Sequence, residues 1–242
     1  MTLHWRIFSS AAVAALLALC PSAGATTVSG NVQLVSSQDP KVRKHMDYSG
    51  VVVWLERLEG EPALPAASHA RMIQKNKTFT PHVLPITVGT IVDFPNYDPI
   101  FHNAFSNYNG QIFDIGLYPP GTTRSIAFRR EGVVRVFCNI HPTMSAVIVV
   151  LKSEHFAVTQ KDGNFQIAGV PEGSYRMHVF HERATDQTLE ACARTIGVSG
   201  ASFQTPSITV SENGYLEVPH KNKYGKDYPA LTDSGSYVGT KP

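Results

Sequence analysis

The sequence predicts an all-β protein of the sandwich type. Short runs that are rich in β-branched and aromatic residues recur along the chain, and turn signals that contain Gly or Pro separate them. Beyond the N-terminal apolar segment, no run shows the apolar period of a helix. Many short strands joined by turns are typical of β-sandwiches.

The strands can be assigned in chain order. We expect them at residues 28–32, 51–55, 86–94, 125–128, 133–138 and 146–151, with turns at 119–121, 131–132, 162–163 and 171–173. Residues 146–151 (AVIVVL) are so apolar that they predict a central, buried strand. In residues 133–138, alternation directs Val134, Val136 and Cys138 to one face.

The N-terminus has the three parts of a secretory signal peptide. Arg6 precedes an apolar run to about Leu19, and an Ala-Gly-Ala cleavage site ends at Ala25. The apolar run is too short to span a bilayer comfortably, and the neighbours of Cys20 are unfavourable for attaching a lipid anchor. We expect residues 1–25 to be removed and the protein to be exported and soluble, periplasmic if the source is a bacterium.

Charge and motifs exclude several function classes. The signal peptide holds one of the 21 Lys and Arg residues, so the mature chain is nearly neutral against 19 Asp and Glu. A neutral balance gives no electrostatic reason to expect nucleic acid as a partner. No other apolar run is long enough for a membrane helix, so we expect no membrane span. No Ser-His-Asp order, phosphate loop or carboxylate pair has a structural context that indicates catalysis, so we expect no enzyme.

Residues 137–144 (FCNIHPTM) bring three types of soft-metal ligand close together in the chain. Cys138 ends an expected core strand, and His141 and Met144 lie on or just beyond the following bend. His102, 36 residues before Cys138, follows a Pro/Asn/Asp turn and can lie at the same end of the sandwich. The four side chains can therefore converge on one metal ion.

This donor set favours copper over other metals. Two imidazoles, one thiolate and a weak thioether are the ligands of blue-copper electron-transfer sites. Structural zinc normally takes four strong ligands, and a c-type haem would need a Cys-x-x-Cys-His motif, which is absent. Singly, a Cys at a strand end and a Met before a buried strand are ordinary packing residues. Their joint order and spacing predict the copper site.

The mature chain retains two cysteines, Cys138 and Cys192. A disulfide between them is one interpretation, because exported proteins can form disulfides. The other interpretation makes Cys138 a thiolate ligand and Cys192 a spare, buried thiol. Only Cys138 has metal-binding neighbours, so we favour ligation.

Residues 73–151 resemble a cupredoxin of the plastocyanin/amicyanin kind. The resemblance rests on FTP at 79–81, LPITVGT at 84–90, His-Asn at 102–103 and CNIHPTM at 138–144, where Cys-x-x-His-x-x-Met is similar to the short ligand loop of amicyanin. It implies a Greek-key sandwich holding one copper ion, which cycles between Cu(I) and Cu(II). By this resemblance the copper ligands are His102, Cys138, His141 and Met144, and the side chain of Asn103 ties the His strand to the Cys loop.

Residues 156–179 resemble a carboxypeptidase regulatory-like (transthyretin-like) sandwich. The strands that usually open such a domain match residues 28–32 and 50–53, which precede the copper domain. We therefore expect a cupredoxin domain at 70–152 that is inserted into a second small sandwich made of 26–57 with 153–218. Two consecutive domains are the alternative. Residues 219–242 read as a polar C-terminal tail, flexible or docked on the surface.

Two functions fit these expectations. The first is a one-electron carrier whose redox partner docks near His141, where Pro142 and residues 99–101 supply an apolar collar. The second is a copper-binding protein that stores or delivers the metal. A buried thiolate on a rigid loop favours the carrier, because transfer proteins usually expose their sulfur ligands. A copper oxidase would need further ligands that this chain does not offer.

Overall fold

The computed structural model describes residues 25–60, 68–107, 110–214 and 220–228. The expected signal peptide, apart from Ala25, lies outside the described residues, and so do residues 219 and 229–242 of the expected tail. In the described ranges, no helix is long and apolar enough to cross a membrane.

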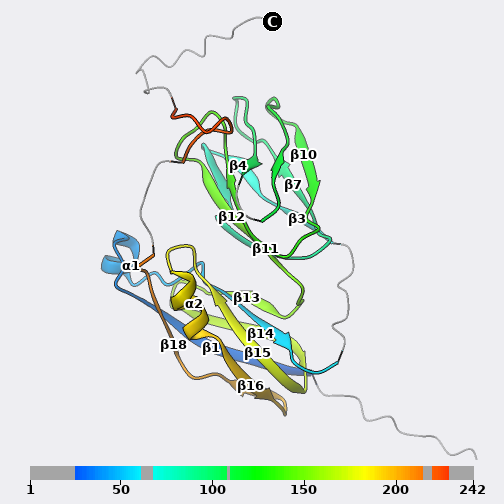
Figure 1. Ribbon diagram of the computed structural model, residues 1–242, viewed down its shortest axis with the longest axis vertical. Helices are drawn as coiled ribbons and strands as arrows, with labels where there is room; N and C mark the ends of the chain where they lie inside the picture. The colour runs from blue at the N-terminus through cyan, green and yellow to red at the C-terminus, as the bar shows by residue number, and fades with distance from the viewer. Residues whose placement is uncertain (1–24, 61–67, 108–109, 215–219, 229–242) are drawn as a thin grey trace, which may run out of the picture.

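The fold is all-β, as predicted, and is built from two stacked units (Figure 1). The central unit spans residues 69–151, and the flanking unit combines residues 25–57 with residues 156–211. The strands of the central unit are β3 (His69–Arg71), β4 (Ile73–Lys75), β5 (Thr78–Thr80), β6 (Val83–Thr87), β7 (Ile91–Pro95), β8 (Phe105–Ser106), β9 (Phe113–Asp114), β10 (Thr123–Ala127), β11 (Gly132–Phe137) and β12 (Ser145–Leu151). The elements of the flanking unit are β1 (Ala25–Val35), α1 (Pro40–His45), β2 (Val52–Arg57), β13 (Phe156–Val158), β14 (Asn164–Pro171), β15 (Gly173–Phe180), α2 (Asp186–Cys192), β16 (Arg194–Val198), β17 (Ser202–Gln204) and β18 (Ile208–Ser211).

The central unit is a sandwich of two sheets. One sheet has the strand order β6-β12-β11-β8-β9 and the other β10-β7-β3, while β4 and β5 pair with each other. Strand β12 runs antiparallel to β11 and parallel to β6, which confirms its predicted central position. Val134, Val136 and Cys138 are all fully buried in the same core, as their alternation predicts.

One expected strand of the central unit is wrong. Residues 86–94 form parts of two strands, β6 and β7, which belong to different sheets. The chain turns between them at Gly89, whose φ is +94°. This left-handed conformation costs little without a Cβ, so a single glycine ends one strand and allows the next to begin elsewhere.

The flanking unit is a second sandwich. Its sheets are β14-β1-β17, with β18 also paired to β1, and β13-β2-β15-β16. Strands β1 and β2 are therefore hydrogen-bonded to strands that follow residue 155, although the whole central unit intervenes in the sequence. Apolar side chains from both sheets form one continuous core.

The two units share an apolar interface. Alternate residues of β12 face opposite ways: Ala146, Ile148 and Val150 lie in the core of the central unit. Val147, Val149 and Leu151 instead pack with Val52 and Phe180 of the flanking unit in a separate buried cluster. Strand β12 is buried on both faces, which explains why its sequence is apolar without a break.

Two short helices are absent from the sequence-based expectation. Helix α1 begins after Asp39, whose side chain accepts a hydrogen bond from the amide of Lys41, and Pro40 occupies its first turn. Helix α2 begins after Thr185, whose hydroxyl accepts from the amide of Thr188. Both helices are too short to display an apolar period, so capping residues are their main local signal.

Candidate metal centre

Three of the four expected ligands lie together at one end of the central unit. His102 lies between β7 and β8, Cys138 directly follows β11, and His141 lies in the turn before β12. Their potential ligand atoms lie within 4.8 Å of one another. His102 and Cys138 are fully buried, whereas His141 is partly exposed, so the cluster opens to solvent on the side of His141.

The distances within this cluster fit one shared metal ion. The Sγ atom of Cys138 lies 3.5 Å from Nδ1 of His141 and 3.8 Å from Nδ1 of His102. For metal–nitrogen bonds of about 2.0 Å and metal–sulfur bonds of about 2.3 Å, tetrahedral or trigonal angles place the two donors roughly 3.5–3.7 Å apart. The three donors can therefore surround a small metal ion without rearrangement of the fold.

Met144, the fourth expected ligand, lies at the other end of the same turn. Its side chain is fully buried and belongs to the same core cluster as Cys138. The amide of Cys138 donates to the carbonyl of Met144 over 3.1 Å, and the amide of Met144 donates to the carbonyl of His141 over 3.1 Å. These bonds close the ligand turn through its own backbone.

Asp98 orients His102, and sequence reasoning missed it. Nε2 of His102 lies 2.7 Å from Oδ2 of Asp98, which is itself buried. Burial raises the pKa of Asp98, but hydrogen bonds from the amide of Lys77, from His102 and from the amide of Asn76 outweigh it, so the net pKa lies below its usual value. With its proton on Nε2, His102 presents an unprotonated Nδ1 toward Cys138. The only sequence signal was an acid four residues before the His.

Burial shifts the pKa values of Cys138 and His141 in opposite directions, and each shift favours the neutral side chain. Burial raises the pKa of the Cys138 thiol, while backbone amides of Ile140, Asn103 and His141 oppose that rise by pointing at the sulfur. Burial also lowers the pKa of His141 to about 4, and the neighbouring His102 acts in the same direction. An imidazole that stays neutral keeps a lone pair for a metal, and a bound cation would favour the thiolate.

Asn103 connects the strand of His102 to the turn of Cys138. Its Oδ1 accepts a hydrogen bond from the amide of Asn139 over 3.2 Å, and its Nδ2 donates to Oδ1 of Asp114 over 2.7 Å. The side chain is buried, and both its oxygen and its nitrogen form hydrogen bonds inside the protein. Asn103 thus lies where the sequence analysis expects it to act.

Cys192 lies in the other unit. It ends helix α2, is buried, and its Sγ lies 3.4 Å from the carbonyl of Thr209. Both Cys138 and Cys192 are free thiols in the structure, and they belong to different cores. The disulfide that the sequence left open does not form here.

The two chain segments that carry His102 and His141 expose apolar and aromatic side chains. Phe101 is 42% exposed and Tyr97 is 56% exposed, both on the loop that carries His102. Pro142, next to His141, is partly buried. Of the expected collar, Pro99 and Phe101 are exposed and Ile100 and Pro142 are partly buried, so parts of it reach solvent on the two chain segments that carry His102 and His141.

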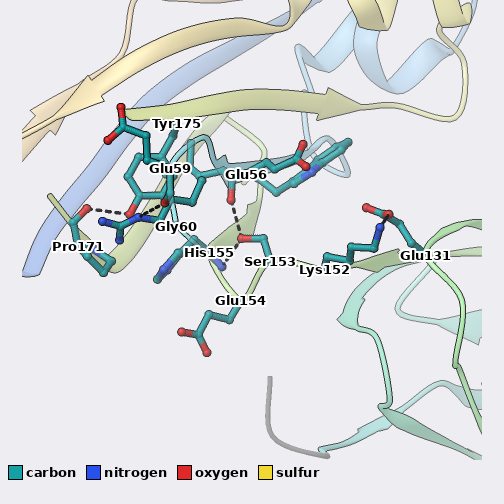
Figure 2. A pocket seen from close by; sticks show the side chains of 13 residues that line it. Glu56, Glu59, Gly60, Glu131, Lys152, Ser153, Glu154, His155, Pro171 and Tyr175 are labelled. Carbon is teal, nitrogen blue, oxygen red and sulfur yellow. Dashed lines mark hydrogen bonds and ion pairs between the residues drawn. The ribbon is translucent and has the colours of Figure 1, made fainter. Parts of the chain in front are cut away.

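A cavity of about 400 Å³ lies elsewhere, and Figure 2 shows the side chains that line it. None of the four expected metal ligands lines it. Some of its polar groups are paired: Lys152 pairs with Glu131 over 2.8 Å, and Arg57 donates to the carbonyl of Glu59 and to that of Glu172 outside the lining. In the described part of the chain, the side chains placed to share a metal ion lie away from this cavity, so the metal cluster is the better candidate site.

No family model matches the chain. The methylamine utilization protein MauL of Methylorubrum extorquens is 39% identical over 56 residues, which are 23% of this chain and 49% of that protein. The chain therefore spans about half the length of this curated relative.

Three solved structures illustrate the structural similarities. A purple cupredoxin from Nitrosopumilus maritimus matches 34% of this chain and 99% of its own, at 29% identity and a TM-score of 0.31. A reduced mutant of amicyanin matches 40% of this chain and 91% of its own, at 17% identity and a TM-score of 0.32. The copper-containing nitrite reductase NirK from Thermus scotoductus matches 50% of this chain and 28% of its own, at 23% identity and a TM-score of 0.34. The chain is thus similar, over part of its length, to proteins described as a purple cupredoxin, an amicyanin and a copper-containing nitrite reductase.

Proposed function

We propose that this protein is an exported one-electron carrier that holds one copper ion between His102, Cys138, His141 and Met144. The observation that supports it most is the convergence of two Nδ1 atoms and one Sγ at metal-ligand spacing, at one end of a sandwich. A His₂Cys set with a weak thioether is the donor set of blue-copper electron-transfer sites. When bound, copper would supply the Cu(I)/Cu(II) couple.

The surroundings of the cluster favour electron transfer. A carrier gains from ligands that stay in place in both oxidation states, because movement of the ligands slows electron exchange. Here the backbone of the turn is closed by its own hydrogen bonds, and Asp98 fixes the ring of His102. The sulfur is fully buried, whereas a protein that passes metal onward usually exposes its sulfur ligands.

The exposed edge of His141 is the proposed exit for the electron. A redox partner would dock there against the apolar collar of Pro142 and residues 99–101. Transient electron-transfer complexes use small contact areas, which such a collar can provide. We expect no enzymatic activity, because the proposed role needs no substrate site.

The proposal includes a division into domains. Residues 70–152 form a cupredoxin domain, and they are inserted into a transthyretin-like domain made of residues 26–57 with 153–218. The strand pairings of β1 and β2 with β13, β14 and β15 support this division. Residues 1–25 act as the export signal.

The alternative function is copper storage or delivery, and one experiment separates the two. The copper-loaded protein is cycled by voltammetry, and its Cu(I) form is then challenged with a chelator of moderate affinity. A carrier gives reversible waves over many cycles and keeps its Cu(I). His141→Gly should slow exchange with redox partners more than it disturbs the fold. Sluggish exchange with rapid surrender of Cu(I) would support copper handling instead.

A further inference from the structure

The C-terminal segment at residues 220–228 packs against the ligand turn of the central unit. It follows the last strand of the flanking unit, β18, yet Figure 1 shows it, in red, against the far end of the central unit. His220 stacks on Phe137, the residue before Cys138, with ring centroids 4.3 Å apart and planes inclined by 27°. A segment from the end of the chain therefore touches the strand that delivers the expected thiolate ligand.

Tyr228 holds the backbone of Cys138 directly. Its hydroxyl donates to the carbonyl oxygen of Cys138 over 2.6 Å. The edge of its ring also meets His220, with centroids 5.2 Å apart and an interplanar angle of 83°.

Lys223 completes a closed ring of hydrogen bonds around the same turn. Its amide donates to Oδ1 of Asn139 over 3.0 Å, and its Nζ pairs with Oδ2 of Asp114 over 2.8 Å. Asn139 donates its own amide to Asn103, and Asn103 donates to Asp114. The ring runs through Lys223, Asp114, Asn103 and Asn139, so the tail residue links the two chain segments that carry His102 and Cys138.

The segment also forms a turn that is held by its own hydrogen bonds. Oδ1 of Asn222 accepts hydrogen bonds from the amides of Tyr224 and Lys226, over 2.9 and 3.1 Å. The amide of Asn222 donates to the carbonyl of Lys226 over 2.9 Å, and Lys221 pairs with Asp227. A turn held by its own bonds loses less conformational entropy on docking than an extended tail would.

We propose that residues 220–228 are part of the metal centre, with Tyr228 and Lys223 as positioning residues that hold the Cys138–Asn139 peptide in its ligand geometry. This inference rests on the proposed copper function for its spectroscopic consequence, but its structural consequence holds without metal. The flanking unit thereby contributes to the metal centre through its C-terminal extension. Loss of either contact leaves the fold intact and loosens the turn.

The test uses the full-length protein with two single substitutions and two matched controls. Tyr228→Phe removes only the hydroxyl, and Tyr48→Phe does the same to a partly buried tyrosine that packs against the core of the flanking unit. Lys223→Met removes the ammonium group that pairs with Asp114, and Lys226→Met removes another lysine of the same turn, whose backbone alone forms the bonds to Asn222.

The first readout is amide hydrogen exchange in the metal-free protein. Tyr228→Phe and Lys223→Met should each speed exchange at Asn139 and Met144 by about fivefold, as expected for loss of one hydrogen bond of ~1 kcal/mol. The controls should exchange like the wild type. The second readout, after loading with Cu(II), is a shift of the thiolate-to-copper absorption and roughly fivefold faster loss of copper to a chelator in the same two variants.

The two readouts test the role of the segment and the proposed copper function independently. Exchange rates in Tyr228→Phe and Lys223→Met equal to those of the controls would overturn the role of the segment, whatever the copper results. A wild-type protein that binds no copper would overturn the proposed function, while faster exchange in the two variants would still establish the structural role. Faster exchange in the two variants, with an unchanged absorption band and unchanged copper release, would show that the segment stabilises the turn but does not influence the metal. That result would overturn its assignment to the metal centre.

Discussion

Nε2 of His102 lies 2.7 Å from a carboxylate oxygen of Asp98, four residues earlier in the chain, and both side chains are buried. This contact fixes the rotation of the imidazole and leaves Nδ1 on the side of Cys138. The carboxylate is itself held by the amides of Asn76 and Lys77. The amides hold Asp98 in place, and Asp98 in turn holds the proposed ligand His102 in place.

We predict that Asp98→Asn weakens copper binding. The amide nitrogen of Asn can donate to Nε2 and so favours a proton on Nδ1, the tautomer that cannot bind metal there. Loss of such a supporting partner typically costs roughly 10- to 100-fold in metal affinity. Competition with a chelator of known affinity measures the change. Asp93→Asn, which alters a carboxylate on β7 that pairs with His69 and not with a proposed ligand, should bind copper like the wild type; an equal loss in both variants would contradict the role of Asp98.

A second prediction concerns colour. Cu(II) added to the purified protein should give an intense blue or green band, because a thiolate donates charge to the metal. Cys138→Ser should abolish the band, whereas Cys192→Ser should keep it, since Cys192 lies in the core of the flanking unit. Visible absorption and electron paramagnetic resonance measure both. A band that survives Cys138→Ser would contradict thiolate ligation by Cys138.

The third prediction concerns the reduction potential. Met144→Leu should keep a coloured site, because the three strong donors remain within 4.8 Å of one another. It should also raise the potential, since the thioether of Met144 is the proposed axial ligand that stabilises Cu(II) over Cu(I). Voltammetry on wild type and variant decides the sign. Met177→Leu is the matched control, because Met177 is equally buried but lies in the flanking core, and its potential should not change.

A fourth prediction concerns acid stability and the flanking unit. Glu212 is 4% exposed and accepts hydrogen bonds from His181, Arg183 and Ser37. Burial alone would raise its pKa, but these bonds outweigh burial and hold the pKa at about 2 instead of 4.5. A depressed carboxyl pKa contributes stability above pH 4.5, and this contribution is lost as the pH falls toward 2.

The lost contribution amounts to about 3 kcal/mol if the shift is fully realised. Glu212→Gln should therefore be less stable than the wild type at pH 7 and should lose less stability between pH 4.5 and pH 3. Urea unfolding across this range measures both effects. Glu190→Gln changes a 73% exposed carboxylate that pairs with Arg176, and its pH profile should follow the wild type. If Glu212→Gln loses as much stability between pH 4.5 and pH 3 as the wild type does, another group causes the acid-dependent loss.

The fifth prediction concerns the independence of the two units. Residues 70–152 should fold alone around their own core, but they should self-associate, because Val147, Val149 and Leu151 lose their cover from the flanking unit. Residues 153–242 alone should not fold, since β1 and β2 supply part of their core and of both sheets. Residues 26–57 joined by a short linker to 153–218 should regain a dispersed NMR spectrum. A dispersed spectrum from residues 153–242 alone would favour consecutive domains.

The sequence by itself determined the features that depend on near neighbours. Alternation over residues 133–138 placed Val134, Val136 and Cys138 on one buried face, because successive side chains of a strand point to opposite sides. The spacing of Cys138 and His141 fits a single turn, and the two are in contact there. The two short helices after Asp39 and Thr185 were not predicted, because they are too short to carry a periodic signal.

The tertiary structure alone decided the features that join distant segments. No local pattern says that Asp98 faces His102, that the second face of β12 is covered by Val52 and Phe180, or that Tyr228 returns to the carbonyl of Cys138. Each contact depends on how whole sheets pack and on where a distant segment of the chain returns to the same unit. Strand propensity and side-chain alternation act over a few residues, whereas these partners are chosen by burial across the assembled units.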